Sequence, residues 1–511
     1  MNSNTIINST SKFIFQNRMC DEQMLPQFAR DLKASIDLLV NISQDNYQDT
    51  LINVLDSISS KIFSVKMVFE LMGRMTIYKT KDFRIICDFL LEIAKKLKIH
   101  KLKAFIFTKT LENFLIEQGI IDGPHSNIPE YETNSLQTIL ATDNVQELIT
   151  LSSMDENFNY DDKIYAIYNY FHYEKMSLID TAAFFGSEEC FKYLFANNAK
   201  TSIHTLKSAI IGGNIFIINT LEQNITGITN ECLELAILTH SDNIADYFID
   251  KYQLDYSYRS SLSTGNIYFF FKKYFNMGSN PNTLDSTKLN ALQAATFFDF
   301  SSIVEYLIDN GGDINLEDNM RNTPLTISVF NNCELCADLL IKRGAQVDAK
   351  DMFGRTPLLI ACISERENIV KLLIDNNADV NYMSEDHSTP ICVAAERGNS
   401  KIIKYLLDNG ANIELTDQFQ NTPLIISVKN KHIEATKILL DYKANVNARN
   451  KNGMTSLHFV SKLGIEYNEI FDLLIKYKAN PNIKNNGGDI PLKYARQVEN
   501  SHIISILESM S

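Results

Sequence analysis

The feature that most constrains the fold is a short Thr-Pro motif that returns every 33 residues. Four copies have Pro in second place, a fifth has Ser, and an earlier copy has Ala; they begin at Thr323, Thr356, Thr389, Thr422, Thr455 and Asn290. Five of the ten prolines of the chain occupy this one repeat position, Pro491 being the last. A fixed period of this length predicts a stack of similar units rather than the roughly three globular domains that 511 residues suggest.

The letters of each unit predict two helices and a loop. Thr followed by Pro is a helix start, because the hydroxyl accepts from a free first-turn amide and Pro lacks an amide. A short apolar helix follows, and after a break near Gly398 or Gly464 comes an amphipathic helix such as residues 401–407. We expect this second helix to end in a left-handed residue, which is Gly in some units and Asn or Lys in others. These residues are Gly311, Gly344, Asn377, Gly410, Lys443 and Lys478.

The segment from Thr356 to Asn381, TPLLIACISERENIVKLLIDNNADVN, resembles the ankyrin repeat. The resemblance covers residues 290–507 and implies an all-α solenoid of helix-helix-β-hairpin loop units, an ankyrin-repeat α-solenoid. The match departs at the loop tips, where the Gly found in two units is replaced by a larger residue. Gly354 and Gly453 keep it, and we expect different turns at Arg321, His387 and Gln420.

Upstream of residue 290 the two-helix pattern continues at a shorter spacing. It recurs at residues 177–199, 204–224, 230–252 and 263–275, and more weakly at 134–151. Removing six to eight residues from a unit shortens the hairpin and keeps the helix pair. Shortened repeats before regular ones, after a helical N-terminal region, resemble a large set of ankyrin proteins from parasitic protozoa of the trichomonad type.

These patterns divide the chain into five regions. We expect a poorly ordered start (1–20), an N-terminal helical domain (21–130), degenerate repeats (131–289), six regular repeats (290–488) and a C-terminal capping repeat (489–511). Apolar spacing in the N-terminal domain predicts helices at residues 28–42, 50–62, 83–97 and 102–116.

Composition excludes several classes of protein. A net charge of −14 argues against a nucleic-acid surface, and 45% hydrophobic residues argue against a disordered chain. No signal sequence or stretch of about 18 apolar residues is present, and eight scattered Cys indicate a reducing compartment. We predict a cytoplasmic monomer that is neither secreted nor membrane-spanning, without excluding the nucleus.

No motif predicts catalysis, a cofactor or a metal site. Residues 73–80 end like a phosphate loop but lack the second Gly that lets backbone amides wrap a phosphate. Cys333 and Cys336 form an isolated CxxC pair, and the repeat frame places Cys336, like Cys190 and Cys362, in the core. His458 is interpreted as a hydrogen bonder that bridges two repeats. We therefore predict a protein that is not an enzyme.

A basic run from Lys95 to Lys103 is interleaved with apolar residues. A helix that lies on a membrane surface has this composition. The favoured interpretation is the solvated face of a helix, because the N-terminal core needs those apolar residues.

The family resemblance implies that a protein or peptide partner contacts the hairpin tips and the outer ends of the first helices, which line a concave groove. The frame places eleven candidate contact residues there: Phe297, Phe298, Met320, Phe330, Met352, Phe353, Ile363, Arg397, Phe419, Lys429 and Lys462. It also places Asp386 and Glu396 there. Apolar bulk at hairpin tips, where polar residues are usual, is typical of binding surfaces. For Phe297 and Phe298 the alternative is packing against the irregular neighbouring repeat.

We predict a groove that is apolar near residues 297–363 and basic towards Arg397, Lys429 and Lys462, suited to a hydrophobic anchor flanked by acidic residues. The predicted function is a non-enzymatic protein–protein interaction scaffold or adaptor. The alternative is a regulatory or targeting subunit whose N-terminal helical domain recruits an enzyme or membrane while the repeats select the client.

Overall fold

The structure is a computed structural model. It describes residues 25–40, 46–60, 136–154, 158–165, 175–225 and 227–510, with single positions at 42, 63, 68, 72, 89, 92, 93 and 96. The chain forms two compact units, Met1–Gly312 (unit 1) and Asp313–Ser511 (unit 2).

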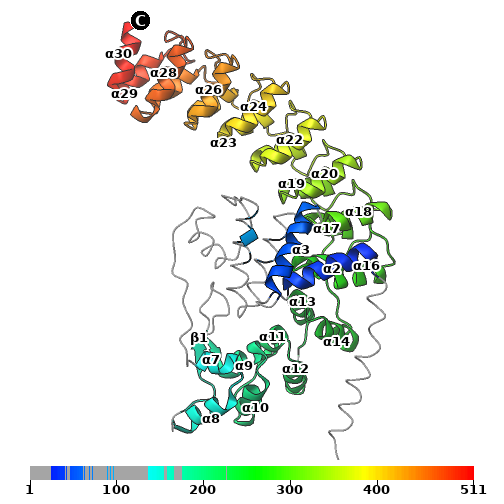
Figure 1. Cartoon of the computed structure of the whole chain (residues 1–511). Helices are drawn as coiled ribbons and strands as arrows, with labels where there is room; N and C mark the ends of the chain where they lie inside the picture. Colours follow the sequence, from blue (N-terminus) through cyan, green and yellow to red (C-terminus); the bar gives the residue numbers. More distant parts are fainter. Residues whose placement is uncertain are drawn as a thin grey trace, which may run out of the picture. The chain divides into compact units, whose positions relative to one another are not determined.

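Unit 2 consists of six helix pairs stacked in register (Figure 1). The first helices form one row, in which each packs on the next: α19 (Pro324–Phe330), α21 (Pro357–Ile363), α23 (Pro390–Arg397), α25 (Pro423–Lys429), α27 (Ser456–Lys462) and α29 (Pro491–Gln497). The second helices form a parallel row: α20 (Glu334–Lys342), α22 (Glu367–Asp375), α24 (Ser400–Asp408), α26 (Ile433–Asp441), α28 (Asn468–Lys476) and α30 (Ser501–Ser509). The short 3-10 helix η3 (Ile465–Tyr467) precedes α28, in a repeat that is two residues longer than the 33-residue period.

The predicted helix starts are confirmed. At Thr323 the side-chain oxygen accepts from the amide of Thr326 (3.3 Å), and Thr356 accepts in the same way from Leu359 (3.4 Å). The predicted left-handed ends are present as well, with φ of 93° at Gly344 and 66° at Lys443. The backbone therefore keeps one conformation at this position although the residue changes.

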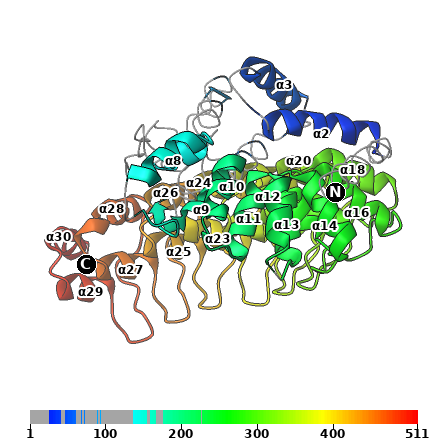
Figure 2. The same ribbon diagram turned by 90° about the horizontal axis from the view of Figure 1, so that it is seen from below.

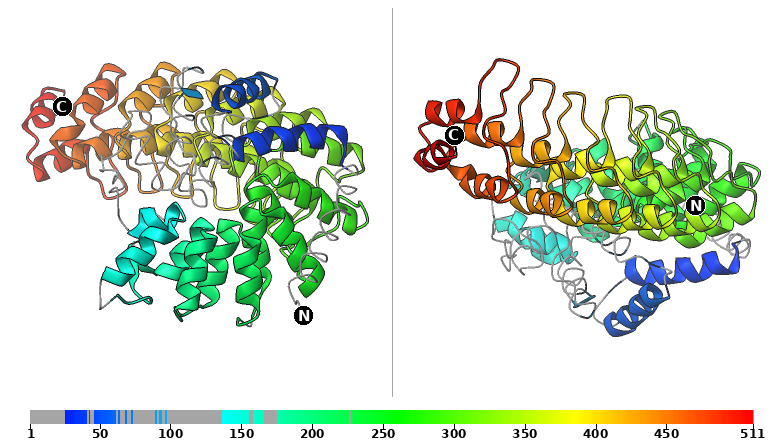
Figure 3. Two further views of the ribbon diagram at one scale, coloured as in Figure 1. Left: turned by 60° about the horizontal axis from the view of Figure 1, so that its bottom comes forward. Right: turned by 90° about the horizontal axis from the view of Figure 1, so that it is seen from above.

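The loops that connect successive helix pairs of unit 2 project side by side from the row of first helices (Figures 2 and 3). The described residues of these loops in unit 2 contain no β-strand, so the hairpins are tight turns rather than paired strands. Arg321, His387 and Gln420 have φ of 60°, 61° and 57°, close to the 71° of Gly354. The expectation of different turns at these tips is therefore wrong.

Side chains at the start of each loop explain why the turn survives the loss of Gly. Asp318 accepts hydrogen bonds from the amides of Met320 and Asn322 (both 2.8 Å), and Asp417 makes the same pair of bonds two residues and four residues on. Each carboxylate stabilises the turn by accepting from amides on either side of the left-handed residue. The strain of a left-handed Gln or Arg is thus offset locally.

Unit 1 contains the shortened repeats as helix pairs. The shortened pairs are α7 (Leu136–Ala141) with α8 (Val145–Met154), α9 (Leu178–Phe185) with α10 (Glu188–Ala196), α11 (Ile203–Gly212) with α12 (Ile215–Glu222), α13 (Asn230–Leu238) with α14 (Asp242–Tyr252), and α15 (Tyr258–Ser263) with α16 (Ile267–Asn276). The last pair of unit 1, α17 (Ala291–Phe297) with α18 (Ser301–Asp309), belongs to the first regular repeat. The link from α10 to α11 spans residues 197–202, whereas the link from α20 to α21 spans residues 343–356. The shortening falls on the loop, as predicted.

Two further features of unit 1 lie outside the repeats. An antiparallel pair of strands, β1 (Lys163–Tyr165) and β2 (Lys175–Ser177), precedes α9 and was not predicted. Helices α2 (Gln27–Val40) and α3 (Tyr47–Ser59) match the first two predicted N-terminal helices, and α2 packs against α16.

Several predictions fall outside the described residues. These are the disordered start at 1–20, most of the helices at 83–97 and 102–116, and the loop at 73–80. Of the five lysines between Lys95 and Lys103 only Lys96 is described, and its Nζ lies 3.9 Å from the Glu92 carboxylate. In the part of the chain that is described, no helix is long and apolar enough to cross a membrane.

Candidate functional site

Nine of the eleven candidate contact residues lie in unit 2, on the loop tips and first helices. Five of them are exposed apolar side chains: Met320 (44% exposed), Phe330 (38%), Met352 (50%), Phe353 (55%) and Phe419 (56%). The basic candidates Arg397, Lys429 and Lys462 are exposed, and Ile363 is partly buried.

The remaining two candidates, Phe297 and Phe298, lie in unit 1. Phe298 is only 6% exposed, so for this residue the structure supports core packing and not partner contact. Phe297 is partly buried, with its ring 4.9 Å from that of Phe298 and the Arg259 guanidinium 4.7 Å from its own centroid. The neighbouring shortened repeat, which contains Arg259, therefore covers part of this aromatic pair.

Met320, Phe330, Met352 and Phe353 form what we call the apolar patch. Its two Met residues lie on adjacent loops that a backbone hydrogen bond joins, since the Met352 amide donates to the Met320 carbonyl (2.9 Å). The Arg355 guanidinium lies 5.5 Å from the centroid of the Phe330 ring and 4.7 Å from that of the Phe353 ring. One cation thus connects an aromatic residue of a first helix with an aromatic residue of the next loop tip.

A buried carboxylate fixes that cation. The Asp351 side chain is fully buried, and its Oδ2 lies 2.6 Å from Nη2 and 2.8 Å from Nε of Arg355. Its Oδ1 accepts from the amides of Phe353 (2.9 Å) and Arg355 (2.8 Å). The geometry of the loop and the position of the cation therefore depend on the same side chain.

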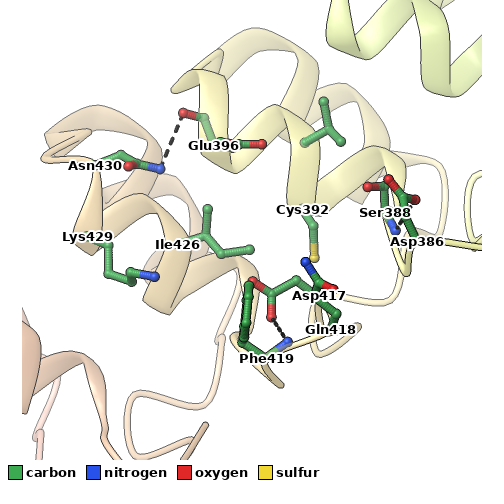
Figure 4. Close-up of a pocket in the computed structure, with 11 residues that line it drawn as sticks. Asp386, Ser388, Cys392, Glu396, Asp417, Gln418, Phe419, Ile426, Lys429 and Asn430 are labelled. Atoms are coloured by element: carbon green, nitrogen blue, oxygen red, sulfur yellow. Dashed lines mark hydrogen bonds between the residues drawn. The ribbon is translucent and has the colours of Figure 1, made fainter. Parts of the chain in front are cut away.

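A pocket of about 290 Å³ lies between α23, α25 and the two adjoining loop tips (Figure 4). We call it the α23–α25 pocket. Its lining is Asp386, Ser388, Cys392, Val393, Glu396, Asp417, Gln418, Phe419, Ile426, Lys429 and Asn430. Two of these residues, Phe419 and Lys429, are among the predicted contacts.

The charge of this pocket differs from the predicted basic groove. Its lining contains three carboxylates (Asp386, Glu396 and Asp417) and one ammonium group, that of Lys429. The prediction does not describe this pocket, because it counted Arg397, Lys429 and Lys462 and left out the acidic residues of the same helices and loops. The frame had placed Asp386 and Glu396 on this surface, but only the tertiary structure shows that they share a pocket with Phe419.

The described cysteines are all buried. Burial raises the pKa of Cys392, which lines the pocket, to about 12, and raises the pKa of the fully buried Cys362 thiol. Cys333 and Cys336 are both buried. Among the described residues, no group of three or more His, Cys, Asp or Glu is placed to hold a metal ion.

His458 bridges two repeats, as predicted. Its Nδ1 accepts from the Thr455 amide (3.1 Å), and its Nε2 donates to the Asp489 carbonyl of the next loop (3.1 Å). Burial lowers the pKa of this imidazole, so the neutral form is favoured.

Two stacked rows of short helices with regular projecting loops define a helical-repeat solenoid. Residues 262–351, 339–417 and 394–485 match the family model described as Ankyrin repeats (3 copies), so this part of the chain consists of ankyrin repeats. Residues 197–273 match a second family, described as a domain of unknown function (DUF3447).

Solved ankyrin-repeat structures are also similar to the chain. The human ASB11 ankyrin repeat domain is 27% identical, with a TM-score of 0.38, over 43% of this chain and 97% of that one. The ankyrin repeat domain of Bcl-3, described as a unique member of the IkappaB protein family, is 28% identical, with a TM-score of 0.40, over 42% of this chain and 97% of that one. No curated protein matches the chain.

Proposed function

We propose that the protein is a non-enzymatic scaffold or adaptor that binds a protein partner through the loop tips and first helices of unit 2. Ankyrin repeats are general protein–protein interaction modules. The observation that carries the proposal is the apolar patch, in which four large residues on adjacent repeats of unit 2 are 38–55% exposed. Clustered exposed aromatic and Met side chains are typical of interaction surfaces.

The patch is also fixed before any partner arrives. Asp351 holds Arg355, and Arg355 lies against the rings of both Phe330 and Phe353. Side chains that are already ordered lose less conformational entropy on binding. This preorganisation supports a role in recognition, because loop stability alone does not require aromatic residues at the tips.

The proposal is tested by the double substitution Phe330→Ala with Phe353→Ala. Partners are captured by the full chain from its native cells and quantified by mass spectrometry against a control, Phe216→Ala. Phe216 of unit 1 is 40% exposed and lies outside the patch. We expect the double variant to lose specific partners by about tenfold or more, since truncating a hot-spot residue costs about 2 kcal/mol. An unchanged partner set in the double variant would remove the patch from consideration.

The alternative, a regulatory or targeting subunit, stays a prediction because most of residues 21–130 lie outside the described residues. The resemblance to trichomonad-type proteins, the cytoplasmic location and the monomeric state also stay predictions. The proposed scaffold role depends on none of them.

A further inference from the structure

The α23–α25 pocket carries a chemistry that the apolar patch lacks. We propose that it binds the guanidinium side chain of an arginine in an extended segment of the partner. This inference rests on the proposed function, because it assumes that a partner lies along the first helices of unit 2. It adds the chemical class of a residue that the partner presents.

The size of the pocket limits what it accepts. At about 290 Å³ it lies just below the roughly 300–1,000 Å³ typical of small-molecule sites. One long side chain of a partner fits such a volume better than a cofactor or a folded element. The neighbouring backbone of that partner would then lie on the rim.

The walls suit a side chain with an apolar stem and a planar cation. Cys392, Val393 and Ile426 are buried and give the pocket an apolar lining. Phe419, a residue that is 56% exposed, lines the same pocket (Figure 4). An aromatic face attracts a cation at about 0.5–2 kcal/mol, and arginine stacks on such faces more often than lysine.

The carboxylates supply acceptors for the same group. Asp417 is committed to its own turn, where it accepts from the amides of Phe419 and Asn421. Glu396 is different, because its carboxylate has no hydrogen bond or ion pair within the described part of the chain, although its backbone carbonyl accepts from Asn430 and His432. Glu396 is therefore the residue available to a guanidinium donor.

Asp386 adds a second negative charge at the rim. The Ser384 hydroxyl donates to its Oδ1, as does the Ser388 amide (3.2 Å), and these bonds lower the pKa of the carboxyl group. The one cation of the lining, Lys429, has its Nζ 5.4 Å from the ring centroid of Phe459 on the next first helix. The lining thus carries a net charge of −2, which favours a cationic ligand and disfavours an acidic one.

The position of the pocket sets the spacing of the motif. It lies about two repeats from the apolar patch along the row of first helices. Neighbouring helices pack about 8–10 Å apart, so the two sites are separated by about 15–20 Å, which about five or six extended residues span. We expect partners to place an arginine at about this distance from an apolar anchor.

The test selects peptides from a random 12-residue phage library on the full-length chain. The best peptide is then synthesised with each arginine replaced in turn by citrulline, which keeps the shape but removes the charge. Dissociation constants are measured by fluorescence anisotropy for the natural chain and for Glu396→Gln. The matched control is Glu434→Gln, which removes the same charge from exposed Glu434 on α26, in the other row.

We expect selected peptides to share an arginine and the citrulline peptide to bind about tenfold or more weakly, as for loss of one charge-assisted hydrogen bond. Glu396→Gln weakens the arginine peptide to a similar degree and leaves the citrulline peptide unchanged, while Glu434→Gln changes neither by more than about twofold. Such coupling between ligand and residue is the sign of a direct contact.

Three outcomes overturn the inference: no peptide is selected, the peptides lack a shared arginine, or citrulline weakens binding equally in the natural chain and in Glu396→Gln. Peptides without arginine that depend on Phe330 and Phe353 would overturn the inference and leave the proposed function standing. If binding depends on neither site, both fail.

Discussion

Asp351 connects the stability of a loop with the shape of the apolar patch, and its replacement tests both. In Asp351→Ala the amides of Phe353 and Arg355 lose their acceptor, and Arg355 loses its ion pair. Each hydrogen bond to a charged acceptor is worth about 1.5 kcal/mol or more. We therefore expect unfolding of unit 2 to become easier by about 3 kcal/mol.

Asp351→Asn is the matched control, and the chain itself provides the precedent. Asn450 occupies the same place in a later loop, and its Oδ1 accepts from the amides of Asn452 and Met454 (both 3.0 Å). Asn at 351 is thus expected to keep the turn and to lose only the pairing with Arg355. Because the Arg355 side chain is 28% exposed and can turn to water, that loss costs about 1 kcal/mol at most.

The assay is urea denaturation followed by circular dichroism, together with hydrogen exchange of the loop amides. Repeat arrays need not unfold in one step, so exchange at Phe353 and Arg355 reports the loop directly. Both amides should exchange faster in Asp351→Ala and keep most of their protection in Asp351→Asn. Equal destabilisation by the two substitutions would refute the claim that the side chain at position 351 stabilises the loop by accepting hydrogen bonds from its amides. The absence of any effect from either substitution would refute it as well.

Two further predictions concern the interfaces between repeats. Gly398→Ala is expected to destabilise unit 2 by more than about 2 kcal/mol in urea denaturation, because φ is +71° and a Cβ would lie 2.4 Å from His432. The control Gly410→Ala should cost only about 1 kcal/mol, because φ there is +86° but a Cβ would meet open space. Similar losses at both sites would show that the contact with His432 does not matter. His458 has its pKa lowered by burial, so the unfolded chain binds the proton more tightly and stability should fall as the pH drops below about 6.5. His458→Gln, which copies the capping role of Gln293, should flatten this part of the urea midpoint–pH curve, and an unaltered curve would contradict the assignment.

Local features of the sequence were enough to predict the repeat. Thr at the N-cap, Pro in the first turn and a left-handed residue at the end of the second helix act within a few residues of one another, and the structure confirms all three. The shortened repeats were also predictable, because each keeps apolar residues at helical spacing. The strands β1 and β2 were missed, since two segments of three residues carry too little pattern to be recognised.

The turns at the tips depended on contacts that the sequence pattern does not reveal. Replacement of the tip Gly suggested different turns at Arg321, His387 and Gln420, yet all three keep a left-handed backbone. A side chain at the start of the loop, such as Asp318 or Asp417, supplies hydrogen bonds that offset the strain. Local propensity was overridden by an acceptor a few residues away.

By itself, the sequence determined the period, the helix pair and the surface on which variable residues appear, because these follow from interactions within one unit. Only the tertiary structure decided which of those residues act together. It buried Phe298 in the core, set Arg355 beside two rings, and brought Glu396 and Phe419 into one pocket whose lining is acidic on balance. The physical reason is that a binding site of a solenoid is shared between adjacent repeats. Its charge and shape therefore depend on packing across a boundary that no single repeat contains.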